Sequence, residues 1–159
     1  MEAALKLSRQ YFLEVKPQQP QRTRFISRER SYHGITLGAL AVGGHKFRRA
    51  NFEPLLMKNV SQVSPCFEYR GKGPRESDED YVQRLAQELD DEFQRVGPET
   101  VCAFVAEPVV GAVRISLTPF RSLCIDATTI GSGLCAFGAR LLQGRPKYLP
   151  KIRSALDLR

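Results

Sequence analysis

Four residues of this sequence are candidates for a ligand site. The stretch SYHG puts an aromatic ring, an imidazole and a glycine side by side at Tyr32, His33 and Gly34, where a strand is expected to lead into a helix. Glu107 directly follows the apolar run VCAFVA, and open α/β sheets bind ligands beyond the carboxyl ends of their strands. Three of these residues have a purely structural interpretation as well. In that interpretation Glu107 caps a neighbouring backbone or faces water, and Tyr32 with His33 forms an aromatic corner at a strand end.

Predicted elements lie on both sides of SYHG. Residues 23–27, centred on Phe25 and Ile26, can form a short strand. The small apolar residues of 37–42 suit a closely packed helix that ends at Gly43-Gly44. The turn between this strand and this helix therefore carries the candidate aromatic and imidazole side chains.

A further helix is expected at the start of the chain, ending before Pro17. Its apolar positions are Ala4, Leu7 and Tyr11 at helical spacing, with Leu5 and Phe12 beside them.

The clearest helix and strand come later. Residues 45–75 contain several turn residues, so loops are expected there, with one short strand near 66–69. Ser77 can cap the next helix, acidic residues fill its first turn, and Gly97-Pro98 ends it. Its apolar stripe comprises Tyr81, Leu85, Leu89 and Phe93. Residues 101–106 are apolar on both faces, as in a strand that helices cover on both sides of a mostly parallel sheet.

Composition indicates a globular protein. With 42% apolar and 26% charged residues, 159 residues suffice for one domain with a core. No apolar run approaches the roughly 20 residues that span a bilayer, and MEAALKLSRQ lacks the pattern of a secretory signal. A cytoplasmic location is expected, with a mitochondrial one left open.

The cysteines form no CxxC pair and have no histidine at metal spacing, so buried, reduced thiols and no metal site are expected.

The net charge of +7 is concentrated in the last third of the chain. Residues 113–159 hold 8 Lys/Arg and 2 Asp/Glu, whereas residues 1–112 hold 16 and 15. Residues 22–58 are also basic, with 8 Lys/Arg against 2 Asp/Glu, yet no motif for RNA or DNA accompanies them. A nucleic-acid-binding module is therefore the least favoured function, because a run of charge is usually a solvated face.

Three motifs together carry a family resemblance. With MEAALKLSRQYF, RFISRERSYHGITLGALAVGG and FVAEPVVGA in this order, residues 2–112 resemble the class III aminotransferases, which use pyridoxal 5'-phosphate and have fold type I. The resemblance implies an α/β fold: part of the three-layer large domain of these transferases, with an incomplete sheet and a poorly ordered basic tail. It covers about two thirds of this chain and the central part of a full family member.

The resemblance also assigns roles to the candidate residues. Tyr32 resembles the aromatic residue that stacks on the pyridine ring of the cofactor, and His33 the imidazole that shapes the pocket. Gly34 lets the backbone turn without a side-chain clash. Glu107 resembles the acidic residue that organises polar groups near cofactor and substrate. Family members act as homodimers with active sites near the subunit interface.

Other parts of the family's site are expected to be missing. The phosphate-binding loop should precede EAALKL, where Met1 stands, and the aspartate on the pyridine nitrogen and the Schiff-base lysine should follow Arg159. The expectation is therefore a class III aminotransferase fragment without a catalytic residue, inactive alone. The alternative is a non-catalytic partner that docks on a full-length homologue.

Residues 113–140 read as an anomalous insert between a family-like part, 1–112, and a returning family-like helix at 141–159. The closing PKYLPKIRSALDLR resembles the family's PGYLPKIR helix, which normally follows AEPVVGA after a short loop. Because Val113-Arg114 can be encoded by GTACGT, an intron start, the hypothesis is a translated intron from Val113 to Gly138.

Overall fold

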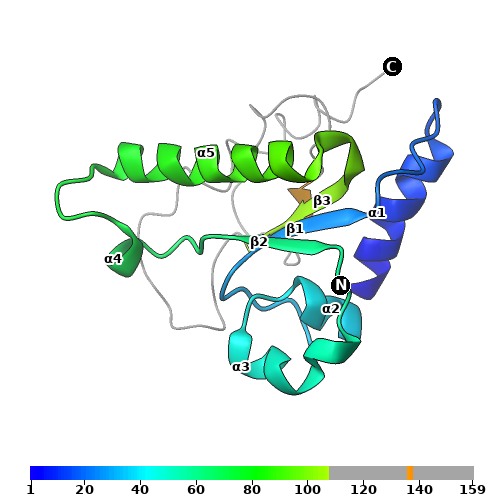
Figure 1. The fold of residues 1–159 in the computed structure, drawn as a ribbon, viewed down its shortest axis with the longest axis horizontal. Helices are drawn as coiled ribbons and strands as arrows, with labels where there is room; N and C mark the ends of the chain where they lie inside the picture. Colours follow the sequence, from blue (N-terminus) through cyan, green and yellow to red (C-terminus); the bar gives the residue numbers. More distant parts are fainter. Residues whose placement is uncertain (108–135, 138–159) are drawn as a thin grey trace, which may run out of the picture.

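A small parallel sheet between helices forms the centre of the molecule (Figure 1). The computed structural model describes residues 1–107 and 136–137. Its strands are β1 (Arg24–Arg28), β2 (Val60–Val63), β3 (Val101–Val105) and β4 (Ala136–Phe137). They lie in the order β2-β1-β3-β4, and all neighbouring pairs run parallel. The predicted α/β fold with a small, incomplete sheet is thus confirmed. Except for β4, the predicted insert at 113–140 and helix at 141–159 lie outside the described residues.

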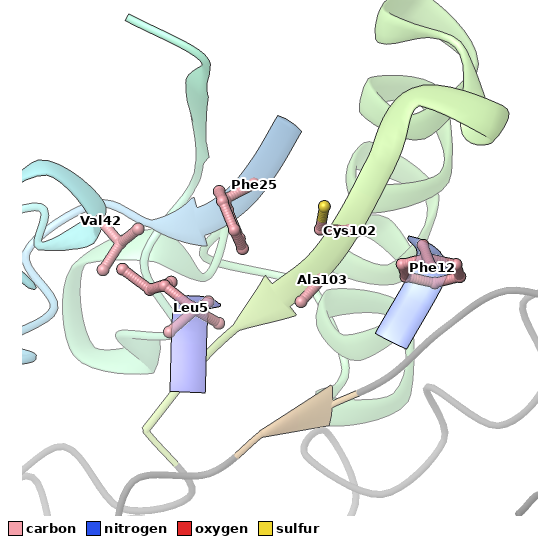
Figure 2. Close-up of a cluster of buried hydrophobic side chains, with 7 residues drawn as sticks. Leu5, Phe12, Phe25, Val42, Cys102 and Ala103 are labelled. Carbon is pink, nitrogen blue, oxygen red and sulfur yellow. The ribbon is translucent and has the colours of Figure 1, made fainter. Parts of the chain in front are cut away.

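Helices cover the two faces of the sheet in separate layers. Helices α1 (Glu2–Glu14) and α2 (Leu37–Val42) pack on one face, whereas α5 (Asp78–Val96) packs on the other. The first face is filled by Leu5, Phe12, Phe25, Val42, Cys102, Ala103 and Val105 (Figure 2). The second is filled by Ile26, Val63, Leu89, Phe93, Val101 and Phe104. Phe25 and Ile26 belong to different layers because successive strand residues point to opposite faces.

The two central strands are almost wholly buried. Every residue of β3 is buried, and in β1 only Arg24 is exposed. A strand with neighbours on both edges and helices on both faces leaves no solvated side, which explains the continuous apolar run of β3. The strands predicted at 23–27 and 101–106 are therefore confirmed to within one residue at each end.

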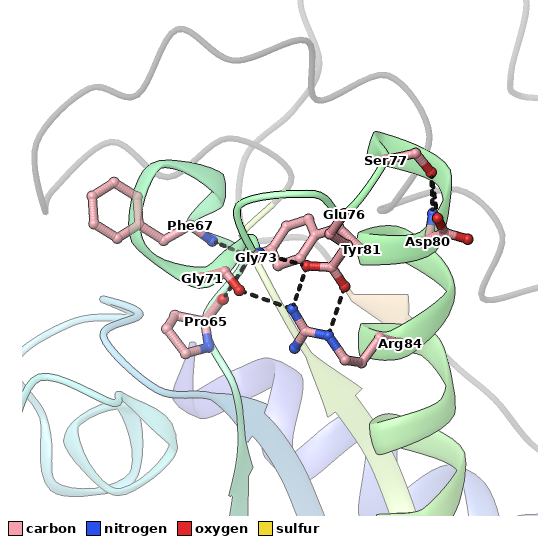
Figure 3. Close-up of polar contacts among 9 residues, drawn as sticks. All are labelled: Pro65, Phe67, Gly71, Gly73, Glu76, Ser77, Asp80, Tyr81 and Arg84. Carbon is pink, nitrogen blue, oxygen red and sulfur yellow. Dashed lines mark hydrogen bonds and ion pairs between the residues drawn. The ribbon is translucent and has the colours of Figure 1, made fainter.

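Helix α5 has the cap, stripe and end that the sequence predicts. The Ser77 hydroxyl accepts a hydrogen bond from the Asp80 amide at 3.1 Å (Figure 3). The stripe of Tyr81, Leu85, Leu89 and Phe93 is buried, and Gly97, with φ of 88°, ends the helix. None of the helices among the described residues is long and apolar enough to cross a membrane.

The strand predicted near 66–69 is wrong. Residues Glu68–Gly71 form the short helix α4, and the second strand is instead β2, at Val60–Val63. The Phe67 amide donates to the Tyr81 hydroxyl at 3.0 Å, and its carbonyl accepts from the amides of Arg70 and Gly71, so this backbone is committed to a turn. The polar sequence VSQV is a strand because it pairs with the free edge of β1.

The segment between β1 and β2 also contains more regular structure than the expected loops. After α2 come α3 (Lys46–Arg49) and the 3₁₀ helix η1 (Ala50–Leu55). Outside this segment, a second 3₁₀ turn, η2 (Pro98–Thr100), lies between α5 and β3.

Only some of the apolar positions expected on α1 are buried. Leu5, Ser8 and Phe12 face the sheet, whereas Leu7 and Tyr11 are about half exposed. Both sets have helical spacing, so periodicity alone could not select between them. Packing against the sheet selects the set that contains Leu5 and Phe12. Phe12 also packs under the Arg22 guanidinium, which lies 4.5 Å from its ring centre.

Candidate functional site

The candidate residues lie where the strand order reverses. From β1 the chain crosses to β2 on one side and then returns to β3 on the other. Open α/β sheets bind ligands at such a switch point, beyond the carboxyl ends of the strands. Tyr32 follows β1 and Glu107 follows β3, so this edge of the sheet receives a candidate residue from each strand.

A hydrogen bond joins these two segments. The backbone N–H of Tyr32 donates to Oε1 of Glu107 at 2.7 Å, and both residues are half-buried. A carboxylate acceptor makes such a bond stronger than one between neutral groups. Glu107 thus does cap a neighbouring backbone, as the structural alternative expects, and the backbone that it holds is that of the candidate aromatic residue.

His33 is buried beside this contact. Burial is the main reason that the pKa of its imidazole is lowered from 6.5 to about 4, and the positive charge of the N-terminal ammonium group contributes to the same shift. The ring is therefore neutral at pH 7. Within the described part of the chain, neither ring nitrogen has a hydrogen-bond partner. A buried neutral imidazole of this kind is available to hydrogen-bond a polar group of a ligand.

Gly34 turns the backbone from this loop toward α2. Its φ of 133° lies in a region that residues with a side chain rarely adopt. A Cβ atom at this position would also lie 3.1 Å from the Cβ of Ala39. Only glycine fits both requirements here.

The loop before Tyr32 is fixed to the end of α2. The Ser31 hydroxyl donates to the Arg28 carbonyl at 2.6 Å and accepts from the Gly44 amide at 3.2 Å. The Arg30 amide donates to the Gly44 carbonyl at 2.9 Å, with Arg30 at φ of 61°. These bonds tie the loop to the end of β1 at Arg28 and to the residue pair after α2 at Gly44.

Glu2 holds the other end of α2, a role that sequence reasoning missed. Its Oε1 accepts hydrogen bonds from the Thr36 hydroxyl at 2.5 Å and the Ala39 amide at 3.0 Å. The bond from Thr36 is the main reason that the pKa of Glu2 is lowered. No local pattern could reveal this cap, because 34 residues separate Glu2 from Thr36.

Two neighbouring arginines complete the surroundings, and both were missed from the sequence. Arg49 donates to the carbonyls of Ala41 at 2.6 Å and Gly43 at 2.8 Å and forms an ion pair with Glu53. The Arg48 guanidinium lies over the Tyr32 ring, 4.8 Å from its centre, which is a cation–π contact. The i,i+4 spacing of Arg49 and Glu53 was the only sequence signal for either residue.

The described residues fit part of the cofactor site that the family resemblance implies. Tyr32 provides an aromatic ring for stacking, and His33 provides a buried imidazole with both nitrogens available. The lysines within residues 1–107 do not fit the Schiff-base role. Lys6, Lys16, Lys46 and Lys58 are exposed, and Lys72 forms ion pairs with Glu68 and Asp78.

Comparison with known proteins finds a consistent group of relatives. The model of the family "Aminotransferase class-III" matches residues 1–118. An aminotransferase of Gibberella zeae is 60% identical over 113 residues, which are 70% of this chain and 22% of that protein. An uncharacterised aminotransferase of Schizosaccharomyces pombe is 51% identical over 119 residues, which are 75% of this chain and 26% of that protein.

Solved structures give the same result. The omega transaminase of Pseudomonas jessenii in complex with PMP matches with a TM-score of 0.68 and 31% identity, over 77% of this chain and 26% of that one. The chain thus spans about a quarter of the length of the proteins that it matches.

Replacing Glu107 should loosen the Tyr32 loop. In Glu107→Ala the acceptor for the Tyr32 amide is lost, whereas Glu107→Gln keeps an oxygen in place. We expect amide exchange at Tyr32 to accelerate by about tenfold or more in Glu107→Ala, since a bond to a charged group contributes about 1.5–3 kcal/mol. Hydrogen exchange followed by NMR measures this rate. Equal rates in wild type and Glu107→Ala would show that the bond does not hold the loop.

His33 should make stability depend on pH. Its folded pKa of about 4 lies below the ordinary 6.5, so the unfolded chain binds more protons between these values. The stabilisation is complete above pH 6.5 and is lost as the pH falls toward 4. We expect the free energy of unfolding to fall by about 2 kcal/mol from pH 7 to pH 5 through this group.

Urea unfolding at both pH values measures the effect. The His33→Gln chain should lose this part of the pH dependence, and the His45→Gln chain, which keeps His33, should retain it. An unchanged pH dependence in His33→Gln would contradict the assignment.

Proposed function

Because the chain belongs to the class III aminotransferases, we propose that it is part of an enzyme that transfers an amino group to a 2-oxo acid by means of pyridoxal 5'-phosphate. The observation that carries this proposal is the hydrogen bond between Tyr32 and Glu107 at the switch point of the sheet, within the residues that the family model matches.

Each candidate residue then has a physical task. The Tyr32 ring would hold the pyridine ring by stacking, which contributes on the order of 1 kcal/mol beyond area burial. His33, neutral at pH 7, forms a wall of the pocket and offers ring nitrogens to a polar group. Glu107 holds the Tyr32 backbone in position, and Gly34 allows the turn into α2. When bound, the cofactor supplies the electron sink of the reaction.

We further propose that the 159-residue chain does not transaminate alone. The support is the environment of the lysines within residues 1–107: Lys6, Lys16, Lys46 and Lys58 are exposed, and Lys72 is held in ion pairs. Amino transfer from alanine to 2-oxoglutarate by the pure chain, followed over time, would overturn this proposal.

Tyr32 should contribute to cofactor binding in a way that can be measured without catalysis. Pyridoxamine 5'-phosphate is a suitable probe because its amine cannot form a Schiff base with lysine. We expect Tyr32→Ala to weaken its binding by about fivefold, the equivalent of losing about 1 kcal/mol of stacking. Fluorescence anisotropy of the probe measures the affinity.

The matched control is Tyr69→Ala, since Tyr69 is 81% exposed and lies on α4. It should bind the probe as the wild type does. Equal affinity in the Tyr32→Ala and wild-type chains would contradict the stacking role.

A second candidate function is a non-catalytic partner that docks on a full-length homologue. It is favoured by apolar side chains that stay exposed around α2, α3 and η1: Ile35 at 79%, Phe47 at 91% and Leu55 at 66%. Covering them would remove apolar surface from water. Co-purification with an intact class III aminotransferase, lost in Phe47→Ser, would support this function; the absence of any complex at micromolar concentrations would exclude it.

We also propose that residues 113–140 are an insert relative to the family. The support is that the family match ends at residue 118, within the first residues of this segment. Sequencing of the transcript across codons 111–147 tests it: codons retained in most molecules would argue against a translated intron.

A further inference from the structure

We propose that a cationic cavity beside the ends of β1 and β2 binds a small oxyanion, either a phosphate or a carboxylate group. The cavity has a volume of about 230 Å³. Three arginines line it, Arg30, Arg70 and Arg84, together with Ser64 and Tyr81, and among the described residues no acidic residue belongs to its lining. Arg30 follows β1 and Ser64 follows β2, so the cavity lies beyond the carboxyl ends of these parallel strands.

A fourth arginine, Arg28, is buried next to this cavity. Arg28 is only 8% exposed and lies over the Phe104 ring, 5.4 Å from its centre. Its guanidinium donates to the carbonyl of Ser64 at 3.3 Å, and within residues 1–107 it forms no ion pair. A buried cation is costly unless it is paired, so an anion bound beside Ser64 would offset the cost.

Two carboxylates that bond to residues lining the cavity are already engaged. Glu76 accepts two hydrogen bonds from Arg84, at 2.8 and 2.9 Å, and one from the Gly73 amide (Figure 3). Glu88 accepts a hydrogen bond from the Ser64 amide at 2.9 Å. Glu76 neutralises Arg84, whereas Arg30 and Arg70 form no ion pair with the acids of residues 1–107. The cavity therefore carries an excess of positive charge.

The walls of the cavity are held in place without a ligand. The Tyr81 hydroxyl accepts a hydrogen bond from the Phe67 amide at 3.0 Å and contacts the Pro65 carbonyl at 3.5 Å (Figure 3). Arg84 donates to the Gly71 carbonyl at 2.8 Å. A cavity fixed in this way needs little ordering to bind an ion, which favours affinity.

This cavity is separate from the candidate cofactor site. Tyr32 and Glu107 meet beyond β1 and β3, whereas Ser64 and Arg70 follow β2. The proposal therefore does not rest on the proposed aminotransferase function, and the failure of one leaves the other standing.

NMR titration with inorganic phosphate, and separately with acetate, tests the proposal at constant ionic strength. We expect saturable shifts at the Ser64 and Phe67 amides and at Nε of Arg84. The double variant Arg30→Gln/Arg70→Gln, at two exposed positions, should weaken binding by about tenfold or more, because two charge-assisted contacts are lost. The matched control is Arg24→Gln/Arg95→Gln, which removes the same charge near the amino ends of the strands.

The outcomes separate the ligand classes. Saturation by phosphate alone assigns a phosphate site, and saturation by acetate assigns a carboxylate site. Shifts without saturation, or equal affinity in the two double variants, would overturn the proposal. The only acidic side chains in residues 108–159 are those of Asp126 and Asp157. If phosphate bound only after both were changed to Asn, a carboxylate of the chain itself would fill the cavity, which would also overturn it.

Discussion

The parallel pairing of β1 with β3 is the contact on which the rest of this structure depends. It brings residues 24–28 beside residues 101–105, although more than 70 residues of chain lie between them. Both strands are buried, so their register is set by apolar side chains that must face one of two helical layers. With this register in place, the loops that leave the two strands start at the same edge of the sheet, and the Tyr32 amide reaches the Glu107 carboxylate.

Polar contacts then fix a loop that packing alone would leave loose. The segment from Arg28 to Gly44 is held by Ser31, Glu2 and Arg49, each of which bonds to backbone groups at an end of α2. Helix α2 has only six residues and no side-chain cap of its own, so its ends depend on these distant partners. The position of Tyr32 and His33 thus depends on backbone contacts made by residues outside the candidate set.

Charge has a different distribution at the two sides of β1. Toward β3, a carboxylate and a neutral imidazole meet an aromatic ring that carries one arginine on its face. Toward β2, arginines predominate, and one of them is buried. A single sheet edge therefore offers a half-buried aromatic surface and a cationic cavity as neighbouring environments.

Much of the fold follows from local pattern, whereas the site does not. The stripe and Ser77 cap define α5, and the unbroken apolar run defines β3, because local propensity and burial agree in both. The motif residues Tyr32, His33, Gly34 and Glu107 could also be chosen from the sequence. Tertiary contacts decided the rest. VSQV became a strand because β1 had a free edge, and α1 buried Phe12 rather than Tyr11 because the sheet lay on that side. The cap by Glu2, the stacking of Arg48 on Tyr32 and the group of arginines around Ser64 join residues that are far apart in the chain, and such contacts exist only once the sheet has formed.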